Sequence, residues 1–359
     1  MATNLRALVC ATLGFVVLAV ACGGDSSKAT PAPTATQATV PSLQTPLPPS
    51  EDLDNKVVPQ LAGLGKIAFW KPNSGIWVMN SDGSDRRRLV DIRQVSTSDE
   101  SPWVSDLRWA PDGQRLSFSS SGRTKEGGVQ DVVRVIDLEG RQQLEIPQAT
   151  SAFWSPDGAS LAFLGSVSHV ETTLEGVPMV MDLATGETKA IGERSWFSEG
   201  PRWRPDGKML VFSDGSGINL VAPDGSGHRL IAGVLRNAGS WPVNWSPSGT
   251  MLSLYYRERD QPEKYIVYDI TQDQVVAAVE LYPSGPAPLR CGRAAVSEDY
   301  QTDWTPDGAT LIFHSECGVT GENGVWLVDL VTGERRLISA WTAWFVDPAP
   351  DGKHLVFMA

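Results

Sequence analysis

The chain has 359 residues, of which 41% are hydrophobic and 20% are charged. This content is sufficient for a folded core, and 34 Gly, 25 Pro and 13 Trp favour many short strands joined by turns over long helices. The formal net charge of −12 argues against nucleic-acid binding, which needs a basic face to contact phosphates. We therefore expect no nucleic-acid partner.

The N-terminal segment has the pattern of a secretory signal. Arg6 is followed by an uncharged, mostly apolar stretch that runs to Ala21 and is shorter than the roughly twenty residues of a membrane-spanning helix. The stretch ends in LAVAC, which resembles the processing site of bacterial lipoproteins, with small residues Ala19 and Ala21 ahead of Cys22. The resemblance implies cleavage after Ala21 and lipid attachment to Cys22. A plain secreted protein and a retained N-terminal anchor are the alternatives.

The segment after Cys22 has the composition of a spacer. From Ala29 to Ser50 it is rich in Pro, Thr and Ala, which favours extended polyproline conformations and cannot build a core. We expect a signal peptide over residues 1–21, a lipidated cysteine and linker over residues 22–55, and a folded domain over residues 56–359.

A five-residue turn recurs in the folded part. WAPDG, WSPDG, WRPDG, WSPSG and WTPDG start at Trp109, Trp154, Trp203, Trp245 and Trp304, at intervals of 42 to 59 residues. Each turn follows a short strand and precedes a second strand with two bulky residues, as in Leu116 and Phe118. A third strand, a second turn such as VTGE and a fourth strand complete the unit. Four strands per period of this length predict the blades of an all-β propeller.

Each residue of the turn has a structural explanation. Pro presets its φ angle, Asp can accept hydrogen bonds from the following backbone, and Gly accepts the positive φ that closes a hairpin. The Trp supplies a large apolar surface where one sheet packs on the next. We interpret these residues as structural, with a direct catalytic or ligand role as the alternative: Trp109, Asp112, Trp154, Asp157, Trp203, Asp206, Trp245, Trp304 and Asp307.

The WxPDGxxLxF pattern, followed by a strand and turn such as WLVDLVTGE, resembles the propeller repeat of the TolB family, which is related to WD-type repeats. The resemblance extends from about Gly65 to Ala359. It implies an all-β propeller of four-stranded antiparallel blades, a fold that serves many functions. TolB proteins also carry an α/β domain ahead of the propeller, where this chain has the signal and linker.

The number of blades follows from how the ends of the chain meet. The segments GKIAFW at Gly65 and PAPDGKHLVFMA at Pro348 resemble incomplete units. We expect six blades, with the C-terminal strands completing the blade that begins at Gly65, because shared closure protects exposed strand edges. A ring of seven blades, one of them incomplete, is the alternative.

Loops of variable length lie opposite the recurrent turns, and such loops on a rigid scaffold commonly carry recognition. We expect the binding surface on this face and at the mouth of the central channel. Aromatic residues before the first strand of several units could anchor a ligand, or could cover blade edges instead. The candidate ligand-binding residues are Trp103, Trp196, Trp241, Tyr300, Trp344, Arg123, Arg257, His169 and His314.

Two cysteines are left after processing at Cys22. An even pair outside the cytoplasm is typical of a disulfide, so we expect Cys291 and Cys317 to be bonded. The bridge would fasten the longest inter-blade insertion.

Signatures of enzymes are sparse. The sequence has no GxSxG, HExxH or CxxC pattern, and its four His residues are few for a metal site. We expect no catalytic residues, no metal and no cofactor. A metal-dependent lyase or other enzyme acting on a polysaccharide, or a carbohydrate-binding propeller, is the alternative.

Together these observations predict a non-catalytic binding scaffold in the bacterial cell envelope. The protein would be monomeric, would face outside the cytoplasm and would contact the membrane through its lipid anchor only. Its expected partner is an envelope protein or peptide.

Overall fold

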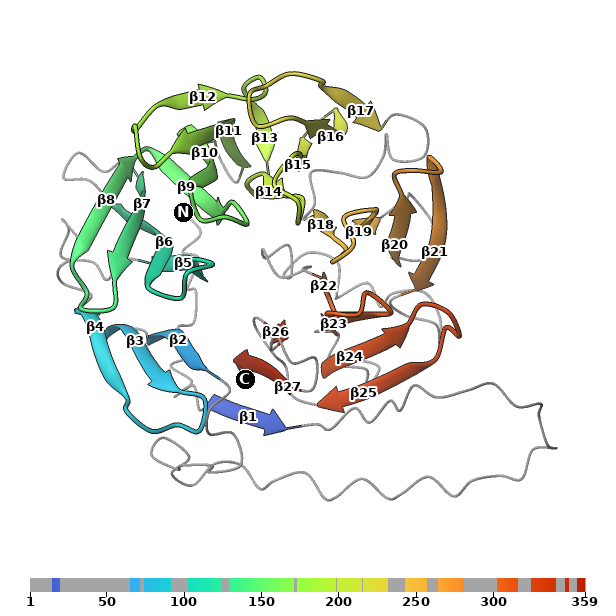
Figure 1. The fold of residues 1–359 in the computed structure, drawn as a ribbon, viewed down its shortest axis with the longest axis horizontal. Coiled ribbons are helices and arrows are strands. Elements are labelled where there is room, and N and C mark those ends of the chain that lie inside the picture. Colours follow the sequence, from blue (N-terminus) through green and yellow to red (C-terminus); the bar gives the residue numbers. More distant parts are fainter. Residues whose placement is uncertain are drawn as a thin grey trace, which may run out of the picture.

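The computed structural model contains only β-strands as regular elements in the residues that it describes. These are residues 15–19, 65–71, 74–91, 103–123, 129–170, 173–197, 199–214, 216–231, 243–256, 264–280, 302–315, 324–339, 346–348 and 354–358. Antiparallel sheets lie around a ring, which is the arrangement of a β-propeller (Figure 1). Within this part of the chain, no helix is long and apolar enough to cross a membrane.

Three sheets are antiparallel meanders of four strands. The first contains β5 (Trp103–Trp109), β6 (Arg115–Arg123), β7 (Val129–Asp137) and β8 (Gln142–Pro147). The second contains β18 (Val243–Trp245), β19 (Met251–Tyr256), β20 (Lys264–Asp269) and β21 (Gln274–Glu280). The third contains β22 (Thr302–Trp304), β23 (Thr310–Ser315), β24 (Gly324–Asp329) and β25 (Arg335–Ser339).

A nine-stranded sheet joins two further units. One unit contains β9 (Ala149–Trp154), β10 (Ser160–Val170), β11 (Thr173–Asp182) and β12 (Thr188–Ala190). The other contains β14 (Arg202–Trp203), β15 (Leu210–Asp214), β16 (Gly217–Val221) and β17 (Arg229–Ile231). Between them, β13 (Ser195–Phe197) pairs with both β11 and β15, so that it fastens one unit to the next.

The two ends of the folded part form separate three-stranded sheets. One contains β2 (Lys66–Lys71), β3 (Gly75–Asn80) and β4 (Arg87–Asp91). The other contains β26 (Val346–Pro348), β27 (His354–Met358) and β1 (Phe15–Ala19). This differs from the closure expected from the sequence, because β27 pairs with β26 and with β1, while β2 pairs with β3. The blade number itself stays a prediction.

The hydrophobic core lies between neighbouring sheets. Ile76 and Val78 of β3 pack with Leu116 and Phe118 of β6, and the next three interfaces repeat this pattern. Leu116 and Phe118 have no exposed surface, because the second strand of each unit is covered by a sheet on either side. The bulky pair in each repeat is therefore the residue set that stacks one sheet on another.

The recurrent turns hold their hairpins through backbone and carboxylate hydrogen bonds. In the first turn Gly113 N donates to Ala110 O (2.9 Å), and Asp112 Oδ1 accepts from Gln114 N (2.8 Å). Gly113 has φ of 64°, a left-handed conformation that a side chain would strain. Asp157, Asp206 and Asp307 accept the equivalent backbone bond at 3.0, 3.1 and 3.0 Å.

Candidate functional site

Of the nine candidate ligand-binding residues, Trp196 alone has its side chain in the part that the structure describes. Trp103, Arg123, His169 and His314 lie in strands β5, β6, β10 and β23, and of these four only the backbone is described. The remaining four candidates lie outside the described residues: Trp241, Tyr300, Trp344 and Arg257. The three cysteines discussed above also lie outside them: Cys22, Cys291 and Cys317.

Trp196 lies on the long hairpin formed by β10 and β11. These strands pair from Ser160 with Asp182 out to Val170 with Thr173, and β13 pairs with β11 near the outer end of this ladder, with Trp196 opposite Glu175. The indole Nε1 donates a hydrogen bond to Glu175 Oε1 (2.6 Å), while 55% of the residue remains exposed. The hairpin end is opposite the recurrent turns, so Trp196 occupies the face on which recognition was expected.

Arg194 precedes this tryptophan by two residues and also contacts the hairpin. Its Nη2 donates to Ser166 O (2.6 Å) and its Nη1 to Ser168 Oγ (3.5 Å). Ser166 has φ of 51°, and Val167 N donates back to Gln148 O (3.0 Å), so the hairpin is irregular where it leaves the sheet. This end of the hairpin thus carries one exposed indole and one exposed guanidinium.

A second group of polar residues comes from the first strands of consecutive units, which we call the inner strands because they lie nearest the ring centre in Figure 1. In each inner strand, the residue just before the Trp of the recurrent turn points to the side of the strand opposite the indole. These residues are Arg108, Phe153, Arg202, Asn244 and Asp303. Arg108 Cζ lies 4.0 Å and Arg202 Cζ lies 4.6 Å from the centre of the Phe153 ring. These side chains therefore meet across three neighbouring units.

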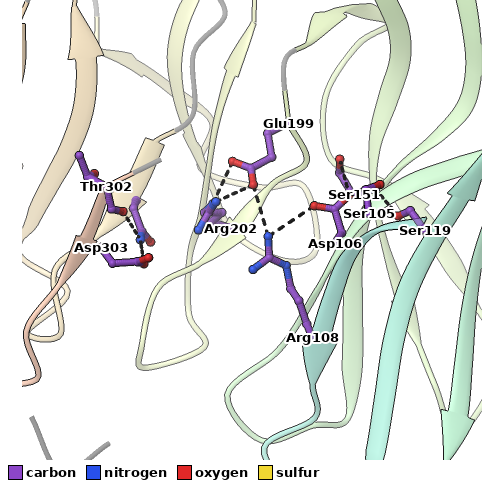
Figure 2. A network of polar contacts seen from close by, with 10 residues as sticks. Ser105, Asp106, Arg108, Ser119, Ser151, Glu199, Arg202, Thr302 and Asp303 are labelled. Carbon is purple, nitrogen blue, oxygen red and sulfur yellow. Dashed lines mark hydrogen bonds and ion pairs between the residues drawn. The ribbon is translucent and has the colours of Figure 1, made fainter. Parts of the chain in front are cut away.

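Glu199 joins the two guanidinium groups (Figure 2). Arg202 Nη2 and Nε donate to its two carboxylate oxygens at 2.5 and 3.2 Å, whereas Arg108 Nη2 is 3.4 Å from Oε1. Glu199 and Arg202 are 8% and 9% exposed, so their ion pair is buried. Burial opposes the charge of Arg202, but the charges of Glu199, Asp303 and Asp106 outweigh it and raise the pKa of this guanidinium.

Bulges in two inner strands aim further polar groups at this network. Asp106 and Ser151 both stand three residues before a repeat Trp, at register shifts of β5 and β9, with φ of 52° and 53°. Ser105 Oγ and Ser151 Oγ donate to Asp106 Oδ2 at 3.3 and 3.4 Å (Figure 2). Gly200 is the equivalent residue of the next unit, and a Cβ there would lie 2.1 Å from Ser151 O.

The adjoining part of the ring carries a smaller polar set. Asn244 Nδ2 donates to Thr302 O (3.0 Å) and to Asp303 Oδ1 (3.2 Å), and the hydroxyls of Ser253 and Thr302 are 2.6 Å apart. We call Asp106, Arg108, Glu199, Arg202, Asn244 and Asp303 the central network. Hydrogen bonds and ion pairs join its members on β5 and β14 through Glu199, and a separate pair of hydrogen bonds joins β18 to β22.

The central network was missed by the sequence analysis. The sequence did contain a signal for it, because side chains alternate between the two faces of a strand. Where the Trp packs between sheets, the residue before it must lie on the opposite face. Because these predecessors differ between repeats, comparison of the repeats alone does not mark them as a group.

Metal ligands do not gather in the described residues. No group of three His, Cys, Asp or Glu with suitable geometry occurs among them. His228 is instead in hydrogen-bond contact with Asn219, with Nε2 and Oδ1 2.8 Å apart.

Comparison with known proteins shows the fold. No family model matches the sequence. A structure of a putative 6-phosphogluconolactonase from Bacteroides uniformis aligns over 81% of this chain and 87% of its own, with TM-score 0.50 and 14% identity. TolB from Acinetobacter baumannii aligns over 82% and 63%, with TM-score 0.49 and 16% identity. A putative TolB from Agrobacterium tumefaciens aligns over 76% and 93%, with TM-score 0.46 and 16% identity.

The fold is a β-propeller. Identities of this size describe shape alone. In sequence, an uncharacterised protein of Agrobacterium fabrum is 31% identical over 162 residues, which covers 43% of this chain. The match spans 48% of that protein, about half its length.

Proposed function

We propose that this TolB-like propeller is a non-catalytic binding scaffold of the bacterial cell envelope, and that its partner is an envelope protein or peptide. In this proposal Cys22 carries the lipid that anchors the chain, the propeller faces outside the cytoplasm as a monomer, and a Cys291–Cys317 disulfide fastens the recognition face. A polysaccharide-acting lyase stays the alternative prediction, which elemental analysis of the purified protein for bound metal tests.

The observation that carries the binding function is the exposed Trp196. Tryptophan is enriched among residues that dominate binding energy, since it offers a large, rigid surface with a polar tip. Here the tip is already bonded to Glu175, so a partner that covers the ring would not have to order this side chain first. The β13 pairing with two units adds rigidity to the platform.

Site-specific photo-crosslinking in envelope preparations tests this function. A photoreactive amino acid is introduced at position 193, which is exposed and three residues before the intact Trp196, or, as a matched control, at position 331. Val331 is 88% exposed but lies in the β24–β25 turn on the opposite face. We expect a discrete crosslinked partner from position 193 and none from position 331. Identical products from both positions, or no product from 193, would contradict the proposal.

The anchor has its own test. The mass of the protein isolated from membranes should correspond to a chain that begins at a lipidated Cys22, and Cys22→Ser should abolish the lipid and the cleavage. An intact chain from Met1 would contradict the lipoprotein assignment while leaving the binding function open to the crosslinking experiment.

A further inference from the structure

The C-terminal strand β27 lies between two strands of different origin. On one side it pairs with β26 (residues 346–348), the strand that precedes it in the chain. On the other side it pairs antiparallel with β1, from Phe15 opposite Met358 to Ala19 opposite His354. All five residues of β27 thus have a counterpart in β1.

The strand β1 belongs to the segment that our proposed processing removes. Phe15–Ala19 reads FVVLA and precedes the expected cleavage site at Cys22. This inference therefore rests on the lipoprotein assignment in the proposed function. Among the described strands, cleavage would leave β27 paired with β26 alone, with an open edge of backbone N–H and C=O groups.

The segment between Cys22 and β2 is poorly supplied with a replacement strand. Between Cys22 and β2, no run of five consecutive residues is both apolar and free of Pro and Gly. The nearest apolar stretch, VVPQLAGLG, is interrupted by Pro59, Gly63 and Gly65. Pro removes a backbone donor and Gly weakens a strand, so this stretch does not reproduce the ladder that β1 forms.

We propose that the open edge of β27 in the processed protein accepts an apolar β-strand from a partner. The strand would pair antiparallel with His354–Met358 and be about five residues long, without Pro, in the manner of strand addition to a sheet edge. Main-chain hydrogen bonds would supply affinity, and the sequence FVVLA of β1 is the template for the added strand. The proposed scaffold would then have a second contact surface, the edge of β27, at which it binds by strand addition.

Hydrogen exchange on the processed lipoprotein in detergent tests this proposal. The probe is a synthetic peptide of residues 15–19 with lysines at both ends for solubility, and the control is the same peptide with Val17→Pro. Without peptide, we expect rapid exchange at the alternate amides of β27 that point away from β26. The probe should slow their exchange at least tenfold, and the Pro peptide should not, because it lacks one donor and cannot continue the ladder.

Three outcomes would overturn the proposal. Slow exchange at these amides without peptide, at all protein concentrations, would mean that the mature chain covers its own edge. Protection of these amides that increases with protein concentration would mean that a second copy of the chain pairs with the edge. Rapid exchange with the probe present would mean that the edge does not accept such a strand. The mass measurement separates these results from failed processing, and crosslinking at position 193 reports independently on the proposed binding function.

Discussion

The indole Nε1 of Trp245 donates a hydrogen bond to the backbone carbonyl of Arg202, 3.1 Å away on the neighbouring inner strand. Trp203 makes the equivalent bond to Phe153 O at 3.1 Å. Trp203 and Trp245 thus pack between sheets and also join inner strands laterally. Trp304 donates instead to Ser253 Oγ of β19 (2.9 Å), and Trp154 Nε1 is buried without a hydrogen-bond partner among the described residues.

This difference predicts unequal costs for the same substitution. Trp245→Phe removes the indole donor to the Arg202 carbonyl, which should lower the free energy of unfolding by about 0.5–1.5 kcal/mol beyond the loss of ring volume. Trp154→Phe loses the same volume but no hydrogen bond, so it is the matched control. Equal destabilisation of both variants in urea unfolding would contradict a role for the indole hydrogen bond.

The buried Glu199–Arg202 pair should be costly to break. Glu199→Gln leaves the Arg202 guanidinium buried without its main counter-charge, and we expect a loss of about 3 kcal/mol of stability. Glu187→Gln, in the exposed pair with Lys189, should change stability by less than about 0.5 kcal/mol. Thermal unfolding of the two variants measures both effects, and a cost below about 1 kcal/mol for Glu199→Gln would show that the central network is not structurally important.

The fourth recurrent turn has Ser248 where the other four have Asp. In the related turns Ser155 and Thr305 donate to Asp157 and Asp307 at 2.6 Å, and these bonds lower the pKa of both carboxyl groups. Ser246 stands in the position of Ser155, so Ser248→Asp should gain the same bonds. We expect a gain of about 0.5–1 kcal/mol at pH 7.

The pH dependence of this gain has a defined sign. Because the folded pKa of such an Asp is below its unfolded value, the gain is present above about pH 4 and is lost as the pH falls through the folded pKa. Urea unfolding of the variant and the wild type between pH 2 and 7 measures the difference. A gain that is independent of pH would exclude the carboxylate as its source.

Gly200→Ala should be more damaging than an ordinary glycine substitution. Its Cβ would lie 2.1 Å from Ser151 O, so the bulge that holds Ser151 beside Asp106 would have to move. We expect a loss of about 2–3 kcal/mol. Gly186→Ala provides the comparison, because its Cβ would meet no atom within 4 Å. Its loss of stability should be about 1–2 kcal/mol, which is the cost of placing alanine in a left-handed conformation.

Much of the fold could be predicted because the sequence consists of recurring units. Pro-Asp-Gly turns and the Leu-x-Phe pair are local signals, and their recurrence predicted an all-β propeller built from stacked sheets. The closing of the ring could not be predicted in this way. Pairing of β27 with β1 joins segments more than 330 residues apart in the chain, and neither strand carries a turn that fixes its partner.

The candidate site was predictable only in part. The exposed Trp196 lies on the expected face, but the pairing of β13 with two units could not be read from a three-residue strand in a segment predicted to be a loop. The central network depends on which inner strands are neighbours and on the bulges at Asp106 and Ser151. Those features follow from tertiary packing, which residue spacing along one strand does not specify.

The affinity of the protein for its crosslinked partner, measured with and without Trp196, tests the central claim most directly. For a tryptophan that dominates an interface, Trp196→Ala should weaken Kd by about 30-fold or more, which corresponds to about 2 kcal/mol. Val331→Ala on the opposite face should leave Kd within about twofold, a change of under 0.5 kcal/mol. An unchanged Kd for Trp196→Ala, with the variant folded as the wild type, would contradict recognition through this face.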